Sequence, residues 1–278
     1  MQIRHAAWAD QFYPGDPEQL KQVISSYLQM ADERKYASRI VGIIAPHAGY
    51  VFSGRTAAAA YRQVEGETYD TVVLLAPSHG AYIEGVSAYN GDYYETPLGN
   101  VPVDTDAVQR LAASAANVKS DETGHESLTD RAEHSLEVQL PFLQSVLTDF
   151  NIVPLVFHDF TWDNCRQLGD AIAALFDAST TLIVASSDLY HGQSYDECCR
   201  MDERTLDSIE NDSAIQFCYG SNSKKVMACG AGPIATLKLV AEKWETHQPQ
   251  VIARTNSADV TGAKKGYVVG YAAAVVTV

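Results

Sequence analysis

IVGIIAPH, at residues 40–47, is a short apolar run that ends in a proline and a histidine. The pattern returns at residues 71–79, TVVLLAPSH, with one serine between the proline and the histidine. Short apolar runs of this kind are typical of strands that are buried on both faces of a sheet. Proline offers no N–H to a neighbouring strand, so each strand is expected to end there and to direct the next side chains outward.

Two further apolar runs have the same form, IVPLVF at residues 152–157 and LIVA at residues 182–185. Amphipathic or alanine-rich stretches between the runs predict helices, the first of them capped by Asp16-Pro17. The other helices are expected at about 53–64, 104–115, 135–147, from Thr161 onward, in a region reaching about Tyr219, and at 231–243. A polar loop is expected before residue 135.

The remaining segments predict strands. The alternating stretch 85–103 contains Gly99-Asn100 and predicts a hairpin, and two last strands are expected at 251–255 and 267–276. Apolar strands separated by helices must be covered on both faces. The sequence therefore predicts an α/β fold, in which residues 1–278 form a single three-layer domain around a central, mainly parallel sheet.

The composition is that of a soluble globular protein, with 46% hydrophobic and 20% charged residues. The formal net charge of −15 argues against nucleic acid and anionic membranes as partners. No signal peptide is recognisable, and the longest apolar run, residues 267–278, is too short to span a bilayer. Five cysteines without a CxxC pair do not form a disulfide framework, which predicts a cytoplasmic protein.

Several metal-binding residue types follow the predicted strands. The carboxyl ends of parallel strands lie along one edge of a sheet, where ligands bind. His47, His79 and His158 each follow one strand, and Asp188 follows another with His191 three residues later. A lone histidine after a strand usually bonds to backbone, but the repeated strand–proline–histidine unit favours a metal site. Imidazole suits zinc, iron(II) and copper.

The third ligand has several candidates: Cys229, Asp188, His191, His134 and His158. Cys229 stands just before a predicted helix, a position that favours the thiolate, although an isolated cysteine is more often a buried structural residue. Asp188 and His191 suit an aspartate that orients an imidazole for proton transfer, but also suit a plain loop turn. His134, by its spacing alone, is an unremarkable residue at a helix start.

The order of these motifs resembles that of the Memo family, whose prokaryotic members are called AmmeMemoRadiSam system protein B. The shared segments are Ala45-Pro46-His47-Ala48-Gly49-Tyr50, Ala76-Pro77-Ser78-His79, Glu133-His134-Ser135-Leu136-Glu137, Ser186-Ser187-Asp188 with His191, residues 256–262 and residues 270–273. The resemblance covers essentially the whole chain. It implies an α/β domain similar to class III extradiol dioxygenases, which use non-haem iron(II).

The resemblance also implies a site. His47, His79 and Cys229 match the positions that bind iron or copper in Memo proteins, while His191 and His134 match regions that supply catalytic histidines in the dioxygenases. Those dioxygenases use two histidines and a carboxylate. A cysteine in place of the carboxylate is softer and more easily oxidised, which sets this chain apart from ring-cleaving enzymes.

The expected function is a metal-dependent oxidoreductase that acts on a small molecule or O₂, with Fe(II) preferred and copper or zinc as other options. His191, oriented by Asp188, would exchange protons, and His134 would hydrogen-bond the ligand. His158 is interpreted as an ordinary loop residue, with an extra ligand or a proton relay as the alternative. The rival hypotheses are a non-catalytic metal-handling or peptide-binding module and a zinc hydrolase. By resemblance alone, a radical-SAM protein and an AMMECR-type protein are expected partners.

Overall fold

A computed structural model describes residues 1–34, 36–126 and 132–278. Its centre consists of four parallel strands that lie side by side in the order β2-β9-β3-β8. These strands are β2 (Ile40–Ala45), β9 (Thr181–Ser186), β3 (Thr71–Pro77) and β8 (Asn151–Phe157). All four predicted apolar runs are therefore neighbours in one sheet, and nearly all their residues are buried.

Antiparallel strands extend this parallel centre on both sides. Long strand β12 (Lys265–Thr277) pairs with β2, and β10 (His191–Ser194) and β11 (Gln250–Asn256) pair with β12. At the other edge β4 (Val86–Ala88) pairs antiparallel with β8 and parallel with β7 (Val118–Ser120). A separate small sheet contains β1 (Ile3–Arg4), β5 (Tyr93–Thr96) and β6 (Gly99–Pro102). The sheet is thus mixed, with its parallel part at the centre.

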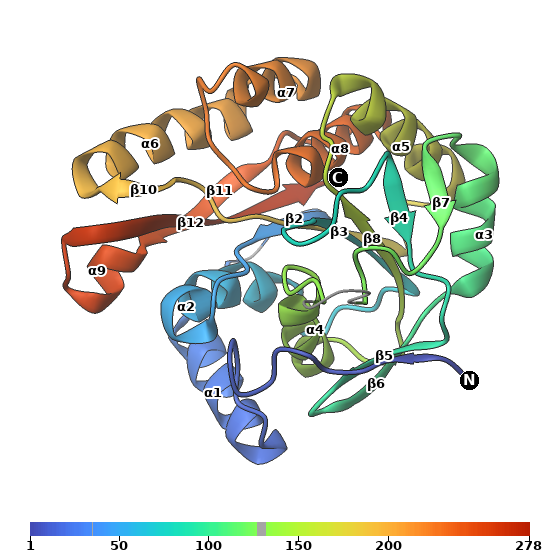
Figure 1. Cartoon of the computed structure of the whole chain (residues 1–278), viewed down its shortest axis with the longest axis horizontal. Coiled ribbons are helices and arrows are strands. Elements are labelled where there is room, and N and C mark those ends of the chain that lie inside the picture. The colour runs from blue at the N-terminus through green and yellow to red at the C-terminus, as the bar shows by residue number, and fades with distance from the viewer. Residues whose placement is uncertain (35, 127–131) are drawn as a thin grey trace.

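Helices cover both faces of the sheet, which confirms the three-layer prediction (Figure 1). One face carries α3 (Thr105–Ser114), α5 (Trp162–Leu175), α7 (Ala214–Asn222) and α8 (Ala231–Lys243). The other carries α1 (Pro17–Met30), α2 (Tyr50–Tyr61) and α4 (Leu140–Val146). Helix α6 (Tyr195–Asn211) packs on β11 and β12, near the short α9 (Ser257–Thr261). Across the described part of the chain, no helix is both long and apolar enough to cross a membrane.

Several boundaries differ from the prediction. Helix α2 begins at Tyr50, directly after Gly49, and ends in a 3₁₀ turn at Arg62–Val64. The expected helix at 135–147 is a 3₁₀ turn, Glu137–Gln139, followed by the shorter α4, so that His134 lies in the loop before it. The loop expected before residue 135 includes residues 127–131, which are outside the described residues.

The predicted hairpin is confirmed, but its turn lies two residues earlier than Gly99-Asn100. Thr96 pairs with Gly99, which leaves Pro97 and Leu98 as the turn. The amide of Leu98 donates to Thr96 Oγ1 over 3.0 Å, and this side-chain bond fixes the earlier turn position. The helical region reaching Tyr219 divides into α6 and α7, because Ser213 begins the second helix with a capping box.

Candidate metal centre

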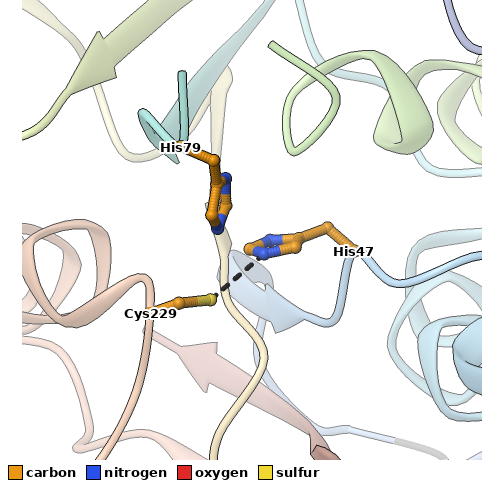
Figure 2. Close-up of side chains that lie close together, drawn as sticks. All are labelled: His47, His79 and Cys229. Carbon is orange, nitrogen blue, oxygen red and sulfur yellow. Dashed lines mark hydrogen bonds between the residues drawn. The ribbon is translucent and has the colours of Figure 1, made fainter. Parts of the chain in front are cut away.

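Three side chains converge at the carboxyl edge of the parallel strands. His47 follows β2, His79 follows β3, and Cys229 stands just before α8; one ligand atom from each lies within 4.8 Å of the other two. Figure 2 shows the two imidazoles and the thiol reaching the same point from three separate segments. The closest contact, 3.1 Å, joins Cys229 Sγ and His47 Nε2. Sequence reasoning thus identified residues that the fold brings together.

Backbone bonds to the end of β9 hold Cys229 in place. Its amide donates to the Asp188 carbonyl over 3.1 Å, and the Asp188 amide approaches Cys229 Sγ at 3.2 Å. The following residue, Gly230, lies so close to this strand that a Cβ there would be 2.2 Å from the Ser186 carbonyl oxygen. Only glycine fits such an approach, so Gly230 lets α8 begin directly beside the sheet.

The hydrogen bonds around Ser186 fix the protonation pattern of His47. Ser186 Oγ is 2.6 Å from the Ser135 carbonyl, which can only accept, so the single hydroxyl proton is used there. Gln139 Nε2 donates to the same oxygen and also to the Pro46 carbonyl, which sets the direction of the amide. His47 Nδ1, 2.8 Å from Ser186 Oγ, must therefore be the donor. The lone pair of His47 is left on Nε2, which faces Cys229.

His79 has the same pattern with a different partner. Its Nδ1 lies 2.9 Å from Glu133 Oε1, so the ring donates there, and in the neutral ring the lone pair is on Nε2. Burial alone would raise the pKa of Glu133, but hydrogen bonding and charge from His79 lower it to about 2. The carboxylate is therefore ionised. Metal-binding histidines characteristically donate their second ring N–H to a carboxylate or another acceptor.

The pKa shifts differ between the members of the cluster. Burial lowers the pKa of His47 well below its ordinary value, and the imidazoles of His79, His134 and His191 lower it further. Burial also raises the pKa of the Cys229 thiol well above its ordinary range, with the nearby Asp188 charge adding to the effect. The pKa of Asp188 rises to about 7, again because of burial. Burial also acts to lower the pKa of His79, but the hydrogen bond and charge of Glu133 outweigh it and raise that pKa. The cluster therefore combines a neutral His47 and a neutral Cys229 thiol with a His79 that must release any proton on Nε2 before it can bind a metal.

The expected pairing of Asp188 with His191 is wrong. Asp188 Oδ1 accepts from the backbone amide of His47 over 2.8 Å, so the carboxylate ties the end of β9 to the end of β2. His191 begins β10, and its Nδ1 lies 3.0 Å from the Leu189 carbonyl, to which it must donate. The spacing of three residues places the two groups on one loop, but each has a nearer partner.

The other predicted histidines have different surroundings. The ring of His134 lies 4.6 Å from that of His79 and 5.5 Å from that of His47, between centroids, so it forms part of the cluster. Burial lowers its pKa to about 4. His158 is exposed, and its Nδ1 lies 3.3 Å from the Ser78 carbonyl. His158 belongs to neither of the two groups of possible metal ligands found among the described residues.

Sequence reasoning missed the residues that support the candidate ligands. Glu133 and Ser186 hold the rings of His79 and His47, and Gln139 holds Ser186. The buried Glu137 accepts hydrogen bonds from the amides of Ala7 and Trp8, which attaches the N-terminal segment beside the cluster. Glu133, Ser186 and Glu137 lie inside the shared motifs, but nothing in their spacing indicates which side chain each would contact.

Comparisons with known proteins agree over almost the full chain. The family model described as Memo-like protein matches residues 4–275. A MEMO1 family protein of Nitrosopumilus maritimus is 32% identical, covering 98% of both chains. One from Aeropyrum pernix is 36% identical, covering 98% of this chain and 99% of the relative. The crystal structure of an uncharacterized protein from Escherichia coli K12 superposes with a TM-score of 0.52 at 13% identity, covering 84% and 99% of the two chains, which is a likeness of fold alone.

Proposed function

Because this chain belongs to the Memo family, whose model covers residues 4–275, we propose that it binds one transition-metal ion through His47, His79 and Cys229 and uses it to oxidise a small molecule. One observation carries the proposal. Two imidazole lone pairs and a sulfur atom converge within 4.8 Å, while the second nitrogen of each ring already donates to a fixed partner.

The donor set fits a metal better than it fits a bare catalytic dyad. A nucleophilic cysteine needs a lowered pKa, whereas burial raises the pKa of Cys229. A bound divalent cation reverses this, since a coordinating thiol is deprotonated outright. Two nitrogens and one sulfur suit iron(II), copper and zinc, and three protein ligands leave a coordination position open. We rank Fe(II) first, with copper or zinc as alternatives; bound there, iron or copper would supply one-electron chemistry toward O₂ or substrate.

The surrounding residues suit proton transfer beside such an ion. His191 donates through Nδ1 to the Leu189 carbonyl, so its Nε2 is free to accept a proton from a substrate hydroxyl or amine. Burial lowers the pKa of His191, which favours the neutral ring with a lone pair on Nε2. His79 is 36% exposed, so small molecules have access to this side of the cluster. His134, beside His79, is placed to hydrogen-bond a bound ligand.

This arrangement favours catalysis over storage, because a storage site needs no free base next to the ion. A zinc hydrolase would use the same ligands, and the identity of the native metal separates it from an oxidoreductase.

All five cysteines are free thiols, which supports the proposal of a reducing, cytoplasmic compartment. The radical-SAM and AMMECR-type partners stay predictions.

The direct test is elemental analysis of protein purified without oxygen or chelators. We expect close to one iron or copper per chain, and loss of that metal in a His47→Ala/His79→Ala double variant. His5→Ala/His247→Ala is the matched control, because it removes two histidines that belong to neither ligand group, and it should keep its metal. Metal-free protein, even after anaerobic reconstitution with Fe(II), Cu(I) and Zn(II), would contradict the proposal.

A second prediction concerns pH. The raised pKa of Cys229 means that a metal must displace the thiol proton. The affinity for Co(II), a spectroscopic probe for Fe(II) or Zn(II), should therefore rise about tenfold per pH unit between about pH 7.5 and 9. Anaerobic titration with a competing chelator measures this slope. Cys229→Ser should lose most of it, because serine is not deprotonated; a flat profile in the unaltered protein would exclude the thiol as a ligand.

A further inference from the structure

We infer that Glu133 positions the ligand His79 and makes the centre favour divalent over monovalent ions. The inference rests on the proposed metal site and adds to it a residue that is not itself a ligand. Glu133 lies next to His134, shortly before the 3₁₀ turn Glu137–Gln139, and its side chain is only 2% exposed.

The carboxylate of Glu133 holds His79 at two points. Oε2 accepts from the backbone amide of His79 over 2.6 Å, and Oε1 accepts from Nδ1 of the same residue over 2.9 Å. The ring is thereby fixed relative to its own backbone, with Nε2 directed toward His47 and Cys229. Oε1 also accepts from the amides of His134 and Ser135, over 3.0 and 2.9 Å. These two bonds hold the carboxylate itself in position.

The same bonds argue against Glu133 as a ligand. Glu133, His79 and His134 do form a second group of donor atoms within 4.8 Å of one another. However, four N–H groups already occupy the carboxylate oxygens. Coordination through Oε1, which accepts three of them, would leave buried N–H groups without a partner, at a cost of about 1–3 kcal/mol each. The geometry therefore supports one metal ion per chain, with Glu133 behind it.

The two histidine ligands have partners of different charge. His47 donates to the neutral hydroxyl of Ser186, whereas His79 donates to an anion. Within the described ranges, no lysine or arginine forms an ion pair with Glu133. Arg4 donates a hydrogen bond to the backbone carbonyl of Glu133, but its guanidinium forms its ion pair with Glu137. The titratable partners of the Glu133 carboxylate are His79 and His134, whose Nδ1 lies 3.2 Å from Oε1. A carboxylate with no permanent cation beside it thus lies behind His79, whereas His47 has only a neutral partner.

This charge acts on the metal in proportion to the charge of the ion. Coulomb energy scales with the product of the two charges, so a divalent ion gains about twice as much as a monovalent ion at the same place. Loss of the charge should therefore weaken divalent binding by a factor that is about the square of the factor for monovalent binding. Loss of ring orientation alone would lower the affinity for both ions, but the two losses would not follow this square relation.

The experiment compares Co(II) and Cu(I) binding in Glu133→Gln by anaerobic chelator competition. We expect about a 10–100-fold loss of Co(II) affinity, the range for removing an outer partner of a metal ligand, and about a 3–10-fold loss for Cu(I). Ser186→Ala is the matched control: it removes the neutral partner of His47 and should lower the affinities for Co(II) and Cu(I) by similar factors. Glu133→Asp keeps the charge, so it should retain the Co(II) preference even if both affinities fall. His79→Ala gives the loss when the ring is removed altogether.

Each outcome separates the possibilities. Equal losses for the two ions in Glu133→Gln would overturn the charge effect, and unchanged affinities would overturn the whole inference. Two Co(II) ions per chain, reduced to one in Glu133→Gln, would make Glu133 a ligand and overturn its positioning role. If the unaltered chain binds neither ion, the proposed function itself fails. If the unaltered chain binds both ions and Glu133→Gln binds them equally well, only the role of Glu133 fails.

Discussion

Replacing Glu137 by alanine is expected to lower the free energy of unfolding by about 3–5 kcal/mol, because it leaves a buried arginine without its counter-charge. The Glu137 carboxylate is fully buried and pairs with the guanidinium of Arg4, which is 1% exposed. It also accepts from the amides of Ala7 and Trp8 and from the hydroxyl of Tyr13. Urea unfolding followed by circular dichroism measures the change.

The control is an exposed ion pair on α1. Glu18 pairs with Lys21 over 2.9 Å, with both side chains more than half exposed, and Glu18→Ala should change stability by less than about 1 kcal/mol. Adding Arg4→Met to Glu137→Ala should recover part of the loss, because it removes the unpaired charge. A loss below about 1 kcal/mol in Glu137→Ala itself would show that this ion pair does not hold the N-terminal segment.

Cys229→Ser is expected to lower the affinity for Co(II) by about two to three orders of magnitude. Structural zinc sites with four ligands bind with about 10–16 kcal/mol, so one ligand contributes roughly 2.5–4 kcal/mol. Serine keeps the size of the side chain and its place beside Asp188, but offers a hard, protonated oxygen. The thiolate charge-transfer absorption of the Co(II) form should disappear together with the affinity.

Cys199→Ser is the matched control, since Cys199 is the exposed cysteine of α6 and lies outside the ligand group. It should bind Co(II) like the unaltered chain and show the same absorption. Full Co(II) affinity in Cys229→Ser would show that the third ligand is another residue. His134 would then be the first candidate, because its ring lies beside that of His79.

Local pattern was enough to predict the parallel centre of the sheet. Four short apolar runs, two of them stopped by proline, are a strong signal, and the ends of parallel strands must share an edge. His47 and His79 follow from that rule. The antiparallel additions on β12 were beyond prediction, because pairing partners at a sheet edge depend on tertiary contacts rather than on the run itself.

The supporting residues of the site were also beyond prediction, for a related reason. Spacing placed Asp188 and His191 on one loop, but it does not reveal that the amide of His47 approaches the carboxylate first. Glu133 is one acidic residue in a polar loop, and its contact with His79 exists only once that loop packs against the end of β3. The direction in which a loop side chain points, and the residue that it contacts, depend on the fold around the loop.

The three proposed ligands come from positions 47, 79 and 229, and the strand that anchors the last of them, β9, ends at Ser186. A ribosome adding roughly 5–20 residues per second exposes the two histidines on the order of ten seconds before the cysteine. Ions that meet the nascent chain encounter an incomplete set of ligands. If the proposed site binds a metal, it would therefore do so only after Cys229 has been synthesised.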